Sequence, residues 1–316
     1  MKKIILILFL VQLSFAKEKD SLFIKNQFSN MLIPALEDLC DACGCAANGG
    51  SMGFASMLDQ NFVGIRYFNQ KYKSRNGLYT NSPWYEEQYN TTQVWGRIPV
   101  FKNFQITAIL PYHSHYRNTE IGNQDISGIG DITMLLFYQL LKKDSTEVKN
   151  IVQLGFGIKI PLGKFDIANN SGVVNQSYQL GTGSWDYPFA IEHILKYKKL
   201  GLNNSFNFIF KTANKNSYQY GNQYNYSSVL FYLIEKNKYS IVPQIGIAGE
   251  IYDENTQYKQ SLKNTKGNII FGKLGFEIGR DQFSLGANVM IPIHQILASG
   301  NLEAVQRWSI NLNFAL

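Results

Sequence analysis

The chain has 316 residues, enough for one large domain or two ordinary ones. Aromatic residues make up 14%, charged residues only 17%, and the formal net charge is +7. This composition favours strands, and the basic residues are spread along the sequence, which argues against a nucleic-acid partner. The mean hydropathy of −0.17 is too low for a bundle of membrane helices but suits strands that turn alternate residues toward lipid.

The first residues have the pattern of a secretory signal peptide. Lys2 and Lys3 precede an apolar stretch over residues 4–10, and small residues at 14–16 offer a cleavage site. The apolar stretch is shorter than the roughly 18 residues that a spanning helix needs, and no longer run follows it. We therefore expect residues 1–16 to be a signal peptide and the mature chain to cross no membrane with helices.

All three cysteines lie in the segment 17–60, at Cys40, Cys43 and Cys45. In an oxidising periplasm they could form one disulfide, with Cys40–Cys43 the easier closure, and leave one thiol. They could instead bind a soft metal such as copper or zinc, with a fourth ligand from Asp41, a histidine or a methionine. Both interpretations stay open. We expect this segment to be a plug in a barrel or a contact for a periplasmic partner.

After Asp59, apolar and polar residues alternate with a period of two, which is typical of strands with two different faces. About twelve such segments follow, each about ten or more residues long, the length that a tilted strand needs to cross a bilayer. The fold class predicted for residues 61–316 is all-β, a transmembrane antiparallel up-and-down β-barrel in a bacterial outer membrane. In the C-terminal segment the apolar face carries Trp308, Ile310, Leu312, Phe314 and Leu316, and the polar face carries Arg307, Ser309, Asn311 and Asn313.

The connections between the predicted strands alternate in length. An even-stranded barrel with both termini in the periplasm has long loops outside and short turns inside. The alternative, a soluble β-sandwich, also has alternating strands, but those strands are usually about five or six residues long. Short connections are expected at residues 102–103, 142–147, 197–199, 235–237 and 280–281, and long ones at 75–87, 118–127, 164–177, 213–223, 253–266 and 298–303.

If the apolar face meets lipid, the polar face lines the lumen, and its charges are nearly balanced. Opposite charges could pair across the lumen and hold its shape, or they could line a polar, weakly selective path for small solutes. A strongly selective pore would need one sign to dominate. The residues predicted on the solute path are Arg66, Arg97, His113, His115, Asp131, Lys159, Glu192, Lys273 and Glu277, and the same face carries Asp186, Lys211, Glu250 and Arg307.

Two histidines lie two residues apart on one face of a predicted strand. His113 and His115 could share a metal or bind an anion, or they could form hydrogen bonds in the lumen. A barrel hydrolase needs a serine beside a histidine on one face, whereas Ser114 lies on the opposite face. The sequence therefore predicts no catalytic site.

The sequence Gly128-Ile129-Gly130-Asp131-Ile132 resembles the Gly-x-Gly-Asp strand motif of outer-membrane transporters grouped under the MetA pathway of phenol degradation. Those transporters are in turn similar to the fatty-acid transporter FadL. The resemblance implies uptake of small, often hydrophobic or aromatic, compounds. FadL-like proteins carry Asn-Pro-Ala near their N-terminus, and residues 33–35 depart from that motif. Only the class, an outer-membrane transporter, is carried over.

Together these features predict a channel or transporter of the outer membrane that passes small solutes through a plugged or gated lumen. Its expected partners are outer-membrane lipid, the barrel assembly machinery and a small-molecule solute, and it is not expected to be an enzyme. No cofactor is required by this prediction. The alternative is an outer-membrane protein that handles copper or zinc through the cysteines of residues 40–45.

Overall fold

The computed structural model describes residues 61–75, 82–119, 122–145, 147–169, 172–173 and 176–316. All of them belong to the second of two compact units, Glu37–Leu316. The predicted signal peptide, the cysteine segment and the predicted plug lie outside the described residues. Among the described residues, no helix is long and apolar enough to span a membrane.

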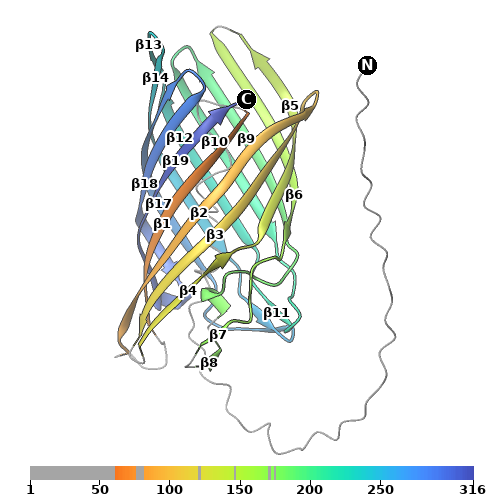
Figure 1. Cartoon of the computed structure of the whole chain (residues 1–316), viewed down its shortest axis with the longest axis vertical. Helices are drawn as coiled ribbons and strands as arrows, with labels where there is room; N and C mark the ends of the chain where they lie inside the picture. Colours follow the sequence, from red (N-terminus) through yellow and green to blue (C-terminus); the bar gives the residue numbers. More distant parts are fainter. Residues whose placement is uncertain (1–60, 76–81, 120–121, 146, 170–171, 174–175) are drawn as a thin grey trace, which may run out of the picture. The chain divides into compact units, whose positions relative to one another are not determined.

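The described chain forms one closed antiparallel β-barrel of 12 strands, which confirms the predicted fold class (Figure 1). Two strands are each interrupted once, so that β4 continues as β5 and β12 continues as β13. The barrel closes through the pairing of β1 with β19 and of β12 with β14. The barrel strands are β1 (Phe62–Arg75), β2 (Trp84–Phe101), β3 (Phe104–Thr119), β4 (Gly122–Ile129), β5 (Ile132–Asp144), β6 (Val148–Ile160), β9 (Tyr187–Tyr197), β10 (Leu200–Phe210), β12 (Gln223–Tyr232), β13 (Ile234–Lys236), β14 (Tyr239–Tyr252), β17 (Gly267–Arg280), β18 (Phe283–Leu297) and β19 (Leu302–Ala315).

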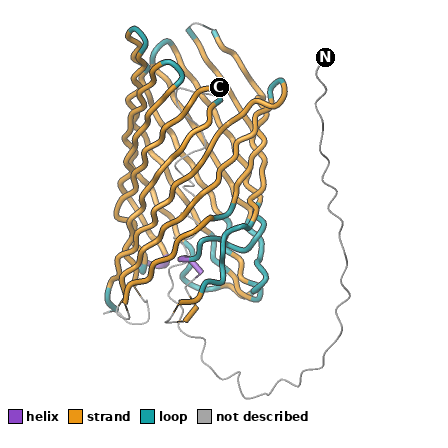
Figure 2. The backbone as a smooth tube through the Cα atoms, in the orientation of Figure 1, coloured by secondary structure: helices purple, strands orange, loops and turns teal. Residues whose placement is uncertain are grey.

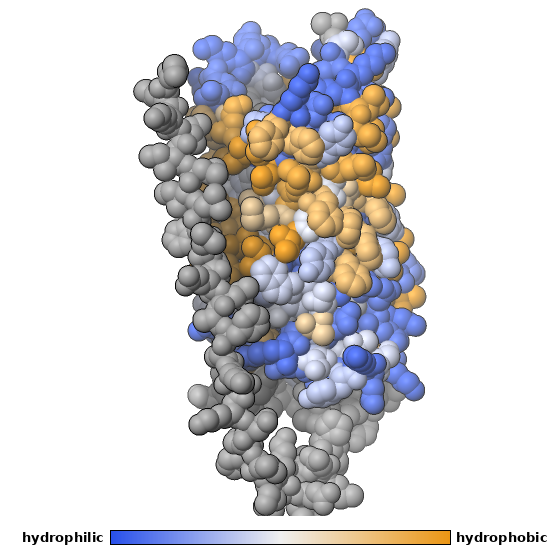
Figure 3. All heavy atoms as spheres, turned by 90° about the vertical axis from the view of Figure 1, so that its right-hand side faces the viewer, coloured by the Kyte–Doolittle hydropathy of each residue, from blue (hydrophilic) through white to orange (hydrophobic). Residues whose placement is uncertain are grey.

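The alternation along each strand separates an apolar outer face from a mostly polar inner face. On β19, Ile310, Leu312 and Phe314 are exposed on the outside, whereas Arg307 and Asn313 are buried inside, as the sequence predicts. On the face that Figure 3 shows, exposed isoleucine, leucine and phenylalanine side chains gather into a band between two polar ends, and similar side chains are exposed on the other barrel strands. The outer surface is therefore apolar where a soluble protein would be polar.

The two ends of the barrel differ in the length of their connections (Figure 2). The short-turn end carries the connections 102–103, 145–147, 198–199, 237–238 and 281–282, and β1 begins there beside the end of β19. Asn103, Lys198, Asn237 and Asp281 adopt positive φ in these turns, as tight hairpins require. The long-loop end carries the connections 76–83, 161–186, 211–222, 253–266 and 298–301.

One predicted loop is wrong. Residues 118–127 were expected to form a long polar connection, but β3 and β4 pair through this region, from Tyr112 opposite Ile129 to Thr119 opposite Gly122. Ile126 is buried on the inner side of β4. The asparagine- and glycine-rich composition resembles a loop, yet the backbone hydrogen bonds of a continuing hairpin outweigh that local preference. The other edge of β4 has no strand partner among the described residues.

The long loops fold back toward the barrel rather than extending from it. Connection 161–186 contains β7 (Ala168–Asn169), β8 (Gly172–Val173) and the 3₁₀ turn η2 (Gln176–Tyr178), and the neighbouring loops contain β11 (Tyr218–Gln219), β15 (Thr256–Gln257), β16 (Gln260–Ser261) and η3 (Ala298–Gly300). Their side chains join wall residues in one buried apolar cluster, which we call the loop-end cluster. It comprises Phe68, Tyr72, Tyr89, Ile126, Tyr178, Leu180, Tyr218, Tyr220, Ala248, Tyr252, Ile269, Phe271, Met290, Leu297, Ala298, Leu302 and Ala304.

Candidate functional site

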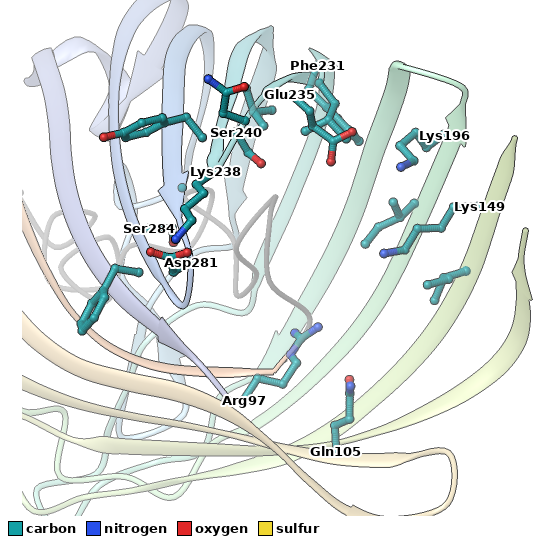
Figure 4. Close-up of a pocket in the computed structure, with 18 of the residues that line it drawn as sticks. Arg97, Gln105, Lys149, Lys196, Phe231, Glu235, Lys238, Ser240, Asp281 and Ser284 are labelled. Carbon is teal, nitrogen blue, oxygen red and sulfur yellow. The ribbon is translucent and has the colours of Figure 1, made fainter. Parts of the chain in front are cut away.

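A cavity of about 760 Å³ lies inside the barrel at the short-turn end (Figure 4). We call it the mouth cavity. Strands from β2 to β18 contribute to its wall, so it follows most of the barrel's circumference. Its polar lining includes Arg97, Gln105, Lys149, Gln153, Lys196 and Lys238. The loop-end cluster lies toward the long-loop end, and the mouth cavity is the candidate site for a solute.

The wall of the mouth cavity is braced by a buried ion pair between β2 and β9. Arg97 binds Glu192 through two parallel hydrogen bonds, Nη1–Oε2 at 2.8 Å and Nη2–Oε1 at 3.0 Å. Arg97 also donates to Thr107 at 2.9 Å and lies over the ring of Phe137. Because β3, β5 and β6 lie between the two strands, the pair bridges a broad section of the wall. Such bidentate geometry fixes the guanidinium in one orientation.

A second buried network holds connection 161–186 against the barrel wall. The Asp131 carboxylate accepts hydrogen bonds from the backbone N–H groups of Gly163 at 3.0 Å and Thr182 at 2.9 Å, and from the Thr182 hydroxyl at 2.9 Å. Lys159 Nζ lies 3.2 Å from Asp131 Oδ2 and 2.5 Å from Asp186 Oδ2. Both acids and the lysine are buried. We call these contacts the loop anchor.

The glycines of the Gly-x-Gly-Asp motif lie close to other side chains, and a Cβ at Gly128 would lie 2.8 Å from Leu180 of connection 161–186. The Cβ of any larger residue at Gly130 would lie 2.3 Å from Nε2 of His113. Across the anchor, a Cβ at Gly181 would lie 2.6 Å from Oδ1 of Asp131. The motif marks the interruption between β4 and β5, where Asp131 turns into the interior. Gly128 therefore leaves room for connection 161–186, and Asp131 binds it.

Connection 161–186 also contacts β4 and connection 211–222. The Tyr178 hydroxyl donates to the backbone oxygen of Gln124 on β4 at 2.7 Å. Burial, followed by the nearby Glu87 carboxylate, raises the pKa of Tyr178 well above its usual range, so the hydroxyl stays a neutral donor. On the surface, Lys215 forms a 2.9 Å ion pair with Asp166. The anchor and Tyr178 hold the loop from the inside, and the surface pair adds little.

Two further buried ion pairs lie in the long-loop half. Arg307 binds Glu250 through hydrogen bonds of 2.7 and 2.9 Å, and the hydroxyls of Tyr72 and Tyr252 join the same pair. Arg117 forms a 2.9 Å pair with Glu87, which also accepts from Tyr89 at 2.8 Å and Ser74 at 2.6 Å.

Sequence reasoning missed Glu87, because residues 75–87 were expected to form a loop. The structure places residues from Trp84 onward in β2, with the Glu87 side chain buried in the interior. Residues 84–88 show no apolar–polar alternation, so the sequence contains no clear signal for a strand there.

The histidine pair lies beside the loop anchor. Nδ1 of His113 lies 2.9 Å from the Thr91 hydroxyl, and the rings of His113 and His115 lie 4.9 Å apart. His115 packs against Tyr89 and Tyr178. Among the described residues, no group of three or more histidine, cysteine, aspartate or glutamate side chains could hold a metal ion. Metal binding by the cysteines at 40–45 falls outside the described residues and stays a prediction.

The remaining predicted path residues are buried on the inner wall without forming one continuous site. Arg66 donates to Gln93 at 3.1 and 2.7 Å and lies over the Trp95 ring. Lys273 and Glu277 are buried on β17. The structure thus distributes the predicted path residues among a brace at the mouth cavity, an anchor under connection 161–186 and separate positions on the wall.

No protein-family model matches the sequence, and no curated protein matches it. Among solved structures, the barrel is similar to the COG4313 outer-membrane channel from Pseudomonas putida F1, with a TM-score of 0.61, 13% identity, and coverage of 83% of this chain and 97% of that one. It is also similar to the β domain of the Bordetella autotransporter BrkA, with a TM-score of 0.51, 8% identity, and coverage of 82% and 100%. These similarities establish the barrel fold. The resemblance to the MetA-pathway and FadL-like transporters stays a prediction.

Proposed function

We propose that this protein is an outer-membrane channel that passes small solutes through a gated lumen. The observation that carries the proposal is the closed barrel itself, with an apolar band on its outside and a polar, hollowed inside. A closed barrel pairs its strands with one another around the whole circumference, here with the exception, among the described residues, of one edge of β4, so its backbone polar groups are satisfied in hydrocarbon. Both solved relatives with this fold are named as outer-membrane or autotransporter barrels, which supports the location.

The apolar band identifies lipid as the first partner. Soluble barrels and sandwiches bury such side chains against a second layer, whereas here isoleucine, leucine and phenylalanine face outward around the barrel (Figure 3). The strand β19 carries aromatic Phe314 on its outer face, and we propose that the barrel assembly machinery recognises this strand. Short turns face the periplasm in known barrels of this type, so we place both ends of the barrel chain there.

The loop-end cluster makes the lumen gated rather than freely open. Tyr178 and Leu180 of connection 161–186, with Tyr218 and Tyr220 of connection 211–222, belong to one buried cluster with wall residues. A solute that reaches the mouth cavity therefore passes only when these loops move. The loop anchor sets how often they move, because it fixes connection 161–186 to the wall.

Planar-bilayer recordings test the channel directly. Purified, refolded protein is expected to give small, discrete and infrequent openings, because residues of two long loops pack in the loop-end cluster. A variant with a weakened loop anchor is expected to open more often. Bilayers that stay electrically silent with both proteins, although folding is verified by mobility on gels, would contradict the channel function.

A charge placed on the apolar band tests the lipid contact. Ile245 is 57% exposed near the middle of β14, so Ile245→Arg is expected to destabilise the barrel in phosphatidylcholine vesicles by about 2–4 kcal/mol. The measurement is the free energy of unfolding from urea titration in vesicles. Tyr258→Arg is the control, because Tyr258 is 72% exposed in a long loop. Equal, small effects at both positions would place Ile245 in water.

A further inference from the structure

The short-turn end carries a marked excess of positive charge. The buried ion pairs deeper in the barrel are balanced, as the sequence analysis expects of the lumen. The turns and strand ends around the mouth are not balanced. Their basic residues are Lys102, Lys142, Lys143, Lys149, Lys196, Lys198, Lys199, Lys236, Lys238 and Arg280, and their acidic residues are Asp144, Glu147, Glu235 and Asp281.

Two of these lysines face each other inside the mouth cavity. Lys149 on β6 and Lys196 on β9 are direct partners in the strand register, and both line the cavity (Figure 4). Both are half-buried, because the cavity wall covers their aliphatic stems. Like charges opposite each other on paired strands are destabilising, and an anion between them would relieve that repulsion.

The acidic residues near the mouth cavity offset the charge of Lys149 only in part and have no member opposite Lys196. Glu192 is committed to Arg97 at 2.8 Å. Asp144 lies opposite Lys149 on the neighbouring strand, but it is exposed at the turn. Glu235 and Asp281 line the cavity with Lys238, and Asp281 lies 3.8 Å from Arg280. Lys196 has Gly201 as its other register partner, so no acid is opposite it on either side.

We propose that the mouth cavity binds small anionic solutes, such as carboxylates or phosphates, through Lys149, Lys196 and Lys238, and that it makes the channel anion-selective. The inference rests on the proposed channel function and names the substrate class of that channel. Besides the paired Arg97, the lining carries three lysines against Glu235 and Asp281, so positive charge is in excess there. A cleft with an excess of one sign of charge and low-dielectric walls concentrates ions of the opposite sign. Arg97 also lines the cavity, but Glu192 balances its charge. The lysines therefore determine the sign of the net charge in the cavity.

The reversal potential in a KCl gradient tests this proposal. Wild-type channels are expected to prefer chloride over potassium several-fold near 0.1 M salt, where the screening length is about 10 Å, and to lose part of that preference as salt rises. The triple variant Lys149→Gln, Lys196→Gln, Lys238→Gln is expected to bring the permeability ratio close to one. The charge-reversing variant Lys149→Glu, Lys196→Glu is expected to favour potassium.

The matched control removes the same number of rim lysines away from the cavity lining. Lys102→Gln, Lys143→Gln, Lys199→Gln changes the net charge equally, so it is expected to keep the chloride preference. Wild-type channels that conduct without preferring chloride would overturn the anion proposal. A control variant that loses as much chloride preference as the cavity variant would overturn it too. Either result would leave the channel function standing. Silence of both wild type and an anchor-weakened variant would overturn both proposals.

Discussion

Asp131→Asn is expected to release connection 161–186 from the barrel wall. The substitution removes one charge of a buried network in which Asp131 accepts from two backbone N–H groups and one hydroxyl and lies 3.2 Å from Lys159. Breaking a buried ion pair from one side costs about 3–5 kcal/mol. Most of this free energy is lost from the attachment of connection 161–186, because the strands of the wall keep their backbone hydrogen bonds to one another. Trypsin is expected to cleave after Lys164 much faster than in the parent protein.

The same release is expected in electrical recordings. If connection 161–186 gates the lumen, Asp131→Asn raises the frequency or conductance of openings. Asp166→Asn is the matched control, since it changes the same residue type in the same connection but breaks only an ion pair whose side chains are 64% and 56% exposed. Such surface pairs contribute about 0–1 kcal/mol. Faster cleavage without more frequent openings would separate the loop anchor from the gate.

Arg307→Met is expected to cause the largest loss of global stability among these variants. It removes the guanidinium that binds Glu250 at 2.7 and 2.9 Å, while the buried Glu250 carboxylate keeps the hydrogen bond from the Tyr252 hydroxyl. The expected cost is about 3–5 kcal/mol, since the guanidinium also packs on the Phe271 ring at 4.4 Å. The measurements are the urea midpoint in vesicles and the temperature at which the folded gel mobility disappears.

Two companion variants make this test specific. The double variant Arg307→Met, Glu250→Gln is expected to recover part of the lost stability, because a buried ion pair can be replaced by neutral groups more cheaply than it can be halved. Arg280→Met is the surface control, since its pair with Asp281 has side chains 61% and 58% exposed. A double variant less stable than Arg307→Met would show that packing, rather than uncompensated charge, dominates at this position.

The sequence alone determined the barrel fold and which face of each strand points outward. Period-two alternation placed Ile310, Leu312 and Phe314 outside and Arg307 inside, and the structure confirms it. This pattern is local, because successive side chains on a strand point to opposite faces whatever the strand pairs with. The short turns were readable for the same reason, since a reversal between two alternating segments needs only local geometry.

Only the tertiary structure decided which interior residues meet and where the loops go. Arg97 and Glu192 are far apart in sequence, and their pairing depends on barrel closure and register. Residues 118–127 look like a loop by composition but continue a hairpin. Connection 161–186 looks external, yet Asp131 anchors it inside. These contacts join segments from different strands, so their free energy comes from burial and charge pairing that no single stretch of sequence contains.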